Sequence, residues 1–434
     1  MKNKIILLLT VLLFCAGLAD AQKYRIKYSA DDKDPLSLEN AIRLALENNY
    51  NLLLTEQDVV ISEQRLKEAK FLYLPEISFN AAATGYNLDS PIVLPDNLGL
   101  RYIAPSRNHN TEDLFYGVGV SATQYLYTGG RTSSTVSMAN AGLKEAMSRY
   151  EAVKYAVIYQ VKEAFFQQLF LQRKEALLKD MVSKAEKYVT GKKYKQWEKV
   201  LVQAELAKMN SKLAALKEEL SSAKLKLINV LNKELNSKVV ITGEFDFNPI
   251  NVDLAKATLW AMEFRPELKS ALYKLEMDNI SVKLSLARRY PNILLGVGYD
   301  RQGEDNLQDE NIQATLALKL PFGYDYGTQL KQKRAEQRQS NLKRAAIEDS
   351  IRSEVLEAYN NLMFWQKETA VRISTWDSIN KELGDLNYDT LSKEEAIKVF
   401  NYYYEAGVDY LEGIKEHMLA LARLELAVGQ DIRE

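Results

Sequence analysis

The segment FYGVGVSATQYLYTGGRTSSTVSMAN, residues 115–140, decides the fold because its residue pattern changes near the middle. Over 115–127 apolar side chains alternate with small or polar ones such as Gly119 and Ser121, which is the period of a β-strand with two different faces. From Arg131 onward apolar residues recur at helical spacing. The sequence therefore predicts a strand that leads through a short turn into a helix.

The predicted helix is unusually long. Between residues 131 and 190 there is no proline and a single interior glycine, Gly142, and such a stretch would form a rod of roughly 90 Å. The stretch 325–383 has nearly the same length and composition. Each rod is expected to turn, near 192–196 and 384–392, and to return as an antiparallel partner over 198–235 and 393–428.

The chain contains a twofold internal repeat. Leu38, Ala41, Ala45, Leu52 and Pro75 recur, 216 residues later, as Leu254, Ala257, Ala261, Leu268 and Pro291. Each copy holds a helical run, a proline and then a strand. A longer loop at about 87–115 in the first copy accounts for the change of offset after the strands. We expect it to face outside the cell, as a solvent-exposed loop or a receptor contact through Arg101, Arg107 and His109.

Period-two patterns predict three further strands, at 76–86, 292–300 and 312–322. Strands of about ten residues with one apolar face are typical of outer-membrane barrels, although a soluble sandwich has the same pattern. Four strands cannot close a barrel, so several chains would have to contribute, with about eight strands from a dimer or about twelve from a trimer.

Composition excludes several classes of function. The 57 Lys and Arg against 58 Asp and Glu give no positive excess for nucleic acid, and a mean hydropathy of −0.29 leaves no room for a bundle of apolar spanning helices. One Cys, with His109 and His417, cannot form a metal site within one chain. No nucleophile and base pair or phosphate loop is visible, and the Gly-x-Gly pairs at 117–119 and 296–298 lie in predicted strands. We therefore expect no enzyme activity, cofactor or metal.

The N-terminus predicts secretion. A basic start, Met1-Lys2-Asn3-Lys4, precedes an apolar run from Ile5 to Phe14 and the small residues Ala19 and Ala21. This is the pattern of a signal peptide over 1–21, whose removal would also remove the single cysteine, Cys15. The predicted division is then 22–235 for the first repeat, with its hairpin at 131–235, and 236–434 for an equatorial segment and the second repeat, with its hairpin at 325–430.

Eight motifs recur in the order and spacing of one known family: Leu36–Ala41, Ala45–Asn49, Tyr73–Ile77, Tyr127–Arg131, Arg265–Leu268, Arg289–Ile293, Leu320–Phe322 and Leu424–Gly429. The sequence resembles the TolC family of outer-membrane efflux and secretion channels over about residues 36–430. The resemblance implies a mainly α protein with a membrane β-barrel. Each protomer would give four strands to the barrel and long antiparallel hairpins to a periplasmic α-barrel in a homotrimer. An equatorial band would include 239–242 and a helix at 254–263.

The resemblance also implies a function. The chain would be a passive exit duct of a tripartite efflux or type I secretion system in the outer membrane of a Gram-negative bacterium. An inner-membrane pump would drive it through a periplasmic adaptor, and outer-membrane lipid would surround its barrel. A periplasmic coiled-coil scaffold without a pore would explain the rods but not the strands, and a diffusion porin would explain the strands but not the rods.

Functional residues are expected at the helical tips. In the family, acidic side chains at the periplasmic tips form rings that favour cations, and Asp385 and Asp389 are the candidates for this gate. Both also suit a solvated turn. Adaptor contacts are expected at these positions: Gly191, Lys192, Lys195, Leu386 and Tyr388. The tips differ from the motif of family members that dock adaptors of resistance–nodulation–division pumps, so the type of partner stays open.

Overall fold

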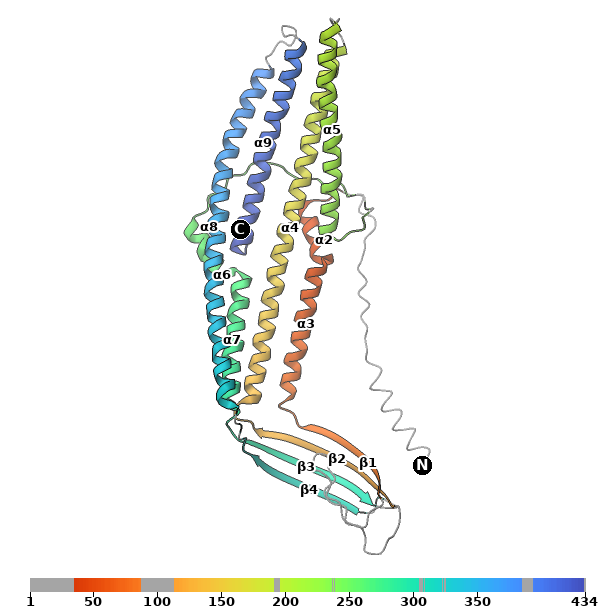
Figure 1. Ribbon diagram of the computed structural model, residues 1–434, viewed down its shortest axis with the longest axis vertical. Coiled ribbons are helices and arrows are strands. Elements are labelled where there is room, and N and C mark those ends of the chain that lie inside the picture. The colour runs from red at the N-terminus through yellow and green to blue at the C-terminus, as the bar shows by residue number, and fades with distance from the viewer. Residues whose placement is uncertain are drawn as a thin grey trace.

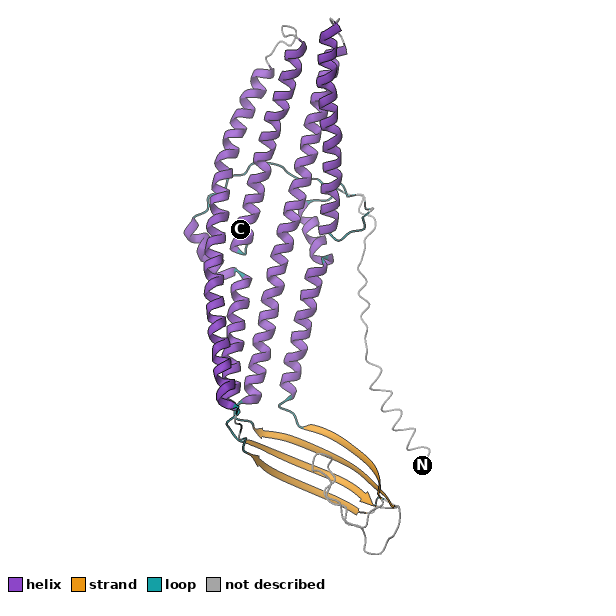
Figure 2. Cartoon of the chain, in the orientation of Figure 1, coloured by secondary structure: helices purple, strands orange, loops and turns teal. Residues whose placement is uncertain are grey.

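The computed structural model describes residues 35–86, 113–190, 196–235, 237, 239–303, 307, 309–321, 323, 325–384 and 393–432. Over these residues the chain is mostly helical, with strands gathered at one end of a long bundle (Figures 1 and 2). The predicted fold class, a mainly α protomer with four strands and long helical hairpins, is confirmed.

Each repeat has the same order of elements. The first contains α2 (Leu38–Asn48), α3 (Tyr50–Phe71), β1 (Glu76–Tyr86), β2 (Asp113–Tyr127), α4 (Arg131–Thr190) and α5 (Gln196–Val230). The second contains α6 (Leu254–Phe264), α7 (Pro266–Ala287), β3 (Asn292–Gly303), β4 (Asp309–Lys319), α8 (Tyr326–Gly384) and α9 (Lys393–Val428). The α2 and α6 helices both have 11 residues and the α3 and α7 helices both have 22, so the internal repeat of the sequence is also a repeat of structure.

The long helices α4 and α8 run along most of the bundle (Figure 1). On the half nearest the sheet, α3 and α7 pack beside them, and on the tip half α5 and α9 do so. The polar residue Asn232, with φ of 50°, follows the end of α5, and the Lys233 backbone N–H donates to the Ile228 carbonyl at 3.1 Å. This left-handed turn explains why α5 stops before the predicted limit of residue 235.

The sheet is antiparallel in the order β1-β2-β3-β4. All four strands lie within three residues of their predicted limits, and the fourth is shifted by three residues at both ends, from 312–322 to Asp309–Lys319. The shift has a local cause, because Pro321 has no backbone N–H to give to a ladder. In the equatorial band, Leu36 forms a parallel bridge with Ile241, and this bridge is the β-structure found around residues 239–242.

Two apolar cores hold the equatorial helices on the long ones. In the first, Ala41 and Ala45 of α2 are fully buried together with Val161 of α4. In the second, Ala257 and Ala261 of α6 are fully buried together with Val355 of α8. Small residues at these positions let the short helices approach the long ones closely, so the repeated alanines of the sequence have a packing role.

Candidate functional site

The sheet has one apolar face, and that face is exposed. Its register aligns Phe79 with Val120, Val120 with Tyr299, and Tyr299 with Ile312, so apolar side chains form rows across all the strands. Phe79 is 80% exposed and Ile312 is 86% exposed. Other exposed members of this face are Ile77, Val118, Leu295, Val297, Leu316 and Leu318. So large an apolar surface requires a cover that the chain does not supply within its described part.

The opposite face carries small and polar residues. The Ser78 and Ser121 hydroxyl oxygens lie 2.7 Å apart, and the Asn311 amide donates to the Asp300 carboxylate at 3.0 Å. A Cβ added at Gly119 would lie 3.1 Å from the Asp300 Cβ, and one at Gly298 would lie 3.1 Å from the Gln313 side-chain nitrogen. Gly119 and Gly298 therefore lie on a crowded part of this face, whereas a Cβ at Gly296 would meet only the Thr315 carbonyl oxygen at 4.0 Å.

Both edges of the sheet are open in the described part of the chain. Strand β1 pairs with β2, and β4 pairs with β3, but neither edge strand has a second neighbour there. An open edge leaves a row of backbone N–H and C=O groups without partners, which a membrane interior does not tolerate. In the described part of the chain, the sheet therefore has an exposed apolar face and two unpaired edges.

Tight turns join the sheet to the helices. Gly129 and Gly130 follow β2 with φ of 61° and 82°, and a Cβ on Gly129 would lie 2.4 Å from the Tyr290 Cβ. The Arg131 guanidinium, at the start of α4, donates to the Asn292 side-chain oxygen at 2.7 Å. These contacts fix the starts of α4 and β3 against each other, so the helices continue directly from the strands (Figure 2).

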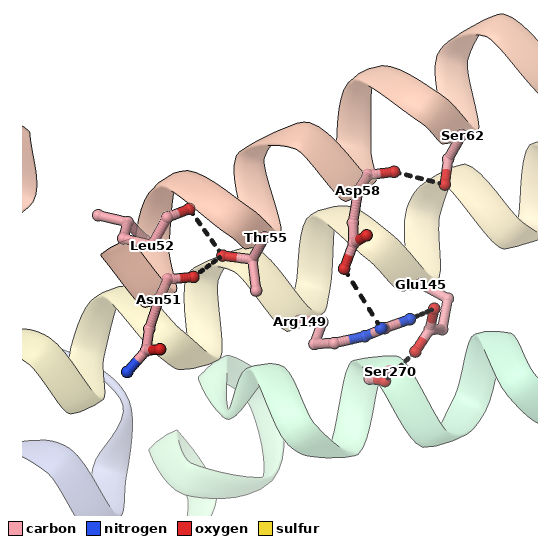
Figure 3. Close-up of polar contacts among 8 residues, drawn as sticks. All are labelled: Asn51, Leu52, Thr55, Asp58, Ser62, Glu145, Arg149 and Ser270. Atoms are coloured by element: carbon pink, nitrogen blue, oxygen red, sulfur yellow. Dashed lines mark hydrogen bonds and ion pairs between the residues drawn. The ribbon is translucent and has the colours of Figure 1, made fainter. Parts of the chain in front are cut away.

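A polar network joins α3, α4 and α7 (Figure 3). The Arg149 guanidinium lies 2.6 Å from the Glu145 carboxylate and 3.7 Å from that of Asp58. The Ser270 hydroxyl donates to the other Glu145 oxygen at 3.1 Å. The hydrogen bond to Glu145 raises the pKa of Arg149 above its ordinary value. The network ties three neighbouring helices into one wall.

Arg265 links the break between α6 and α7 to the end of α9. Its guanidinium donates to the Glu267 carboxylate at 2.9 Å, to the Glu354 carboxylate at 2.9 Å and to the Ala427 carbonyl at 3.1 Å. The first repeat has an amide here instead, since the Asn232 side chain donates to the Asn48 carbonyl at 2.9 Å. Equivalent junctions in the two repeats are therefore held by different side chains, an arginine in the second repeat and an asparagine in the first.

A groove of about 770 Å³ lies between α4, α5 and α9. Its polar lining includes Gln160, Glu163, Gln167, Lys226, Asn229, Glu416 and Arg423. The equatorial helix α2 packs against a different side of α4, which contains Val157, Val161 and Phe165. The groove therefore opens on the side of the helical wall that α2 leaves uncovered.

Charges of both signs meet in this groove. The Lys415 ammonium lies 2.8 Å from the Glu416 carboxylate and 4.8 Å from the centre of the Phe170 ring. Burial raises the pKa of the Tyr159 phenol, and the carboxylate of Glu163 raises it further. The lining of the groove therefore contains both acidic and basic side chains.

The predicted gate and adaptor residues lie outside the described residues: Asp385, Asp389, Gly191, Lys192, Lys195, Leu386 and Tyr388. The long loop predicted at 87–115 lies almost wholly outside them too. Near the first tip, the structure exposes Trp197 and Val200 at the start of α5, by 59% and 62%. Among the described residues, no cluster of His, Cys, Asp or Glu could hold a metal ion, and no helix is long and apolar enough to cross a membrane.

Sequence reasoning did not assign a role to Arg265, to Arg149 or to the groove. The Arg-Pro-Glu motif at 265–267 was visible, and a proline at the first position of a helix marks the break. The contacts of Arg265 with Glu354 and Ala427 could not be predicted, because these residues are distant from Arg265 in the sequence. The groove is likewise formed by positions on separate helices whose facing sides depend on packing.

The geometry defines a class of fold: an open four-stranded antiparallel sheet with an exposed apolar face, continued by long antiparallel helices. Residues 41–191 match the model of the outer membrane efflux protein family. A search of curated proteins finds no match.

Solved structures of similar fold include outer-membrane channels. The open-state MtrE outer membrane channel of Neisseria gonorrhoeae superposes with a TM-score of 0.74 at 16% identity, covering 91% of this chain and 89% of that one. The CmeC outer membrane channel of Campylobacter jejuni gives 0.70 at 15% identity, covering 90% and 85%. A membrane protein from Pseudomonas aeruginosa gives 0.71 at 17% identity, covering 90% and 93%. The chain has the fold of TolC-like channels, and the resemblance predicted from its sequence is confirmed.

Proposed function

We propose that the protein is a passive outer-membrane conduit, the exit duct of a tripartite efflux or type I secretion system. One observation carries the proposal: an open sheet with an exposed apolar face continues directly into helices long enough to reach across a periplasm. A periplasmic scaffold without a pore would have no use for that face. Three protomers would give about twelve strands, which is enough to close a barrel around a lumen.

The edges of one protomer support closure by other copies. Glu68 is exposed three residues before the end of α3, and Lys331 is exposed five residues after the start of α8. The helices α4 and α7 lie between α3 and α8 in one protomer. When β4 of one copy pairs with β1 of the next, Glu68 and Lys331 come to the same level with opposite charges. The groove between α4, α5 and α9 would then form part of the lumen wall.

Membrane fractionation with an unboiled gel tests this proposal. The protein should float with the outer membrane on a sucrose gradient and migrate as an oligomer that boiling converts to the monomer. Recovery in the soluble periplasmic fraction as a monomer would overturn the proposal.

Mass spectrometry of the purified protein tests the proposed leader, because cleavage after Ala21 would leave Gln22 as the first residue.

Asp385 and Asp389 are the proposed gate. Three copies of each carboxylate would meet near the axis and would favour cations over anions. In planar bilayers, Asp385→Asn with Asp389→Asn should lower cation selectivity and weaken block by divalent cations. The control is Asp377→Asn, an acidic residue earlier on α8. Unchanged selectivity and block in the double variant would contradict the assignment.

The proposed partners are a periplasmic adaptor and an inner-membrane pump. The candidate contacts are Gly191, Lys192, Lys195, Leu386 and Tyr388 at the tips. A photo-reactive cross-linker placed at Lys192 or Tyr388 should capture an adaptor in whole cells, whereas the same group at Lys256, on the equatorial helix α6, should not. Equal capture from all three positions would count against contact at the tips.

A further inference from the structure

Exposed apolar and aromatic side chains surround the end of the sheet nearest the helices. Tyr73 precedes β1, Tyr127 ends β2, Tyr290 precedes β3 and Leu320 follows β4, and each is between 44% and 54% exposed. We call this set the junction collar; its other exposed members are Phe71, Leu72, Leu74, Tyr125 and Leu126. Every strand contributes to the collar. Tyrosines that place a ring in hydrocarbon and a hydroxyl in water are typical of a membrane–water interface.

Three exposed cationic side chains lie at the same end of the sheet as the junction collar. Lys70 lies at the end of α3, and Arg288 and Arg289 follow α7. The Arg289 guanidinium lies 3.9 Å from the centre of the Tyr326 ring, and the Arg288 guanidinium donates to the Gln329 side-chain oxygen. None of the three forms an ion pair with another described residue. The Gln329 side chain also donates to the Asp325 carboxylate, so an acidic group lies near Arg288 without pairing with it directly.

The other end of the sheet differs in charge. There the Asp300 carboxylate accepts a hydrogen bond from Asn311, and the Arg301 guanidinium pairs with Glu310 at 3.0 Å. Among the described residues, Arg301 is thus paired directly with an acidic side chain, whereas Lys70, Arg288 and Arg289 have no direct ion pair. Cations without a direct ion pair suit a negatively charged partner at the collar.

We propose that the junction collar binds the headgroups of anionic phospholipids in the periplasmic leaflet of the outer membrane. This inference rests on the proposed function, because it needs the sheet to lie in that membrane. The tyrosines and leucines would reach the acyl boundary, and Lys70, Arg288 and Arg289 would meet headgroup phosphates. A lipid surface fits better than a free anion, because the cations are spread over separate junctions and lie beside apolar side chains.

Native mass spectrometry of the detergent-solubilised wild-type protein tests the proposal. Dioleoylphosphatidylglycerol is titrated in parallel with zwitterionic dioleoylphosphatidylcholine and with inorganic phosphate. The wild type should bind the anionic lipid at least roughly tenfold more tightly than the zwitterionic one, and inorganic phosphate should leave the thermal unfolding temperature unchanged. A triple variant, Lys70→Gln with Arg288→Gln and Arg289→Gln, should lose most of this preference.

The controls separate charge loss from misfolding. Lys208→Gln with Lys217→Gln and Lys256→Gln removes three exposed cations far from the collar and should keep the preference. Arg288→Lys with Arg289→Lys keeps the charge and should also keep it. Equal affinity for both lipids, or an unchanged preference in the triple variant, would overturn the proposal, and stabilisation by inorganic phosphate alone would show a free-anion site instead. If the wild type floats with the outer membrane but shows no preference, the lipid inference fails and the proposed function stands.

Discussion

Arg265 connects the break between α6 and α7 to α8 and to the end of α9 within the second repeat. Its side chain is 9% exposed and donates hydrogen bonds to two carboxylates and to the Ala427 carbonyl near the end of α9. Arg265→Ala would leave that carbonyl without its donor, and it should lower the free energy of unfolding by about 2 to 4 kcal/mol. Urea unfolding in detergent measures this. Arg423→Ala breaks a pair with Glu357 whose arginine is 49% exposed, and this control should cost less than about 1 kcal/mol.

Tyr404 makes the stability of the protein depend on pH in the alkaline range. Burial raises the pKa of its phenol to about 12, and the carboxylates of Glu219 and Glu405 add to the shift. The phenol of Tyr404 ionises near pH 10 in the unfolded chain. Its contribution to the free energy of unfolding is therefore complete below pH 10 and is lost between pH 10 and 12. From pH 9 to pH 11, wild type should lose roughly 1 to 2 kcal/mol more than Tyr404→Phe. Tyr402→Phe, at a side chain 69% exposed, should behave as wild type; equal losses in all three would contradict this.

At the scale of elements, α9 packs closely between α4 and α8 at Gly407. A Cβ there would lie 2.5 Å from Leu177 on α4 and 2.9 Å from Trp376 on α8. Gly407→Ala should therefore destabilise the protein by about 1 to 3 kcal/mol in thermal unfolding. Gly142→Ala on α4 is the matched control, since its Cβ would meet only the Met277 methyl at 3.7 Å. That control should be neutral or stabilising by up to about 1 kcal/mol, and an equal effect of both changes would contradict the packing argument.

Elements with a strong local signal were predictable from sequence. Residues 131–190 contain no proline, so the limits of α4 followed from the pattern alone. The end of α5 at Val230 was missed because it depends on Asn232 adopting a left-handed turn, which no periodicity shows. The groove and the contacts of Arg265 needed the packing of helices far apart in sequence. The proposed gate at Asp385 and Asp389 lies outside the described residues, so it stays a prediction.

At the scale of the whole molecule, one protomer has two different edges, α3 with β1 and α8 with β4. Repeated contact between unlike edges forms a closed ring when the rotation between copies closes, and an open filament when it does not. The proposed conduit needs a ring, because only a closed sheet satisfies every backbone group within lipid.

Cross-linking between the edges tests this central claim most directly. Glu68→Cys with Lys331→Cys places one thiol on each edge, and the intervening helices α4 and α7 keep the two apart within a protomer. A short bis-maleimide applied to purified membranes should give a ladder of monomer, dimer and trimer that ends at the trimer, and neither single-cysteine variant should give a trimer. A chain that stays monomeric, or a ladder that continues past three, would contradict a closed conduit of three protomers.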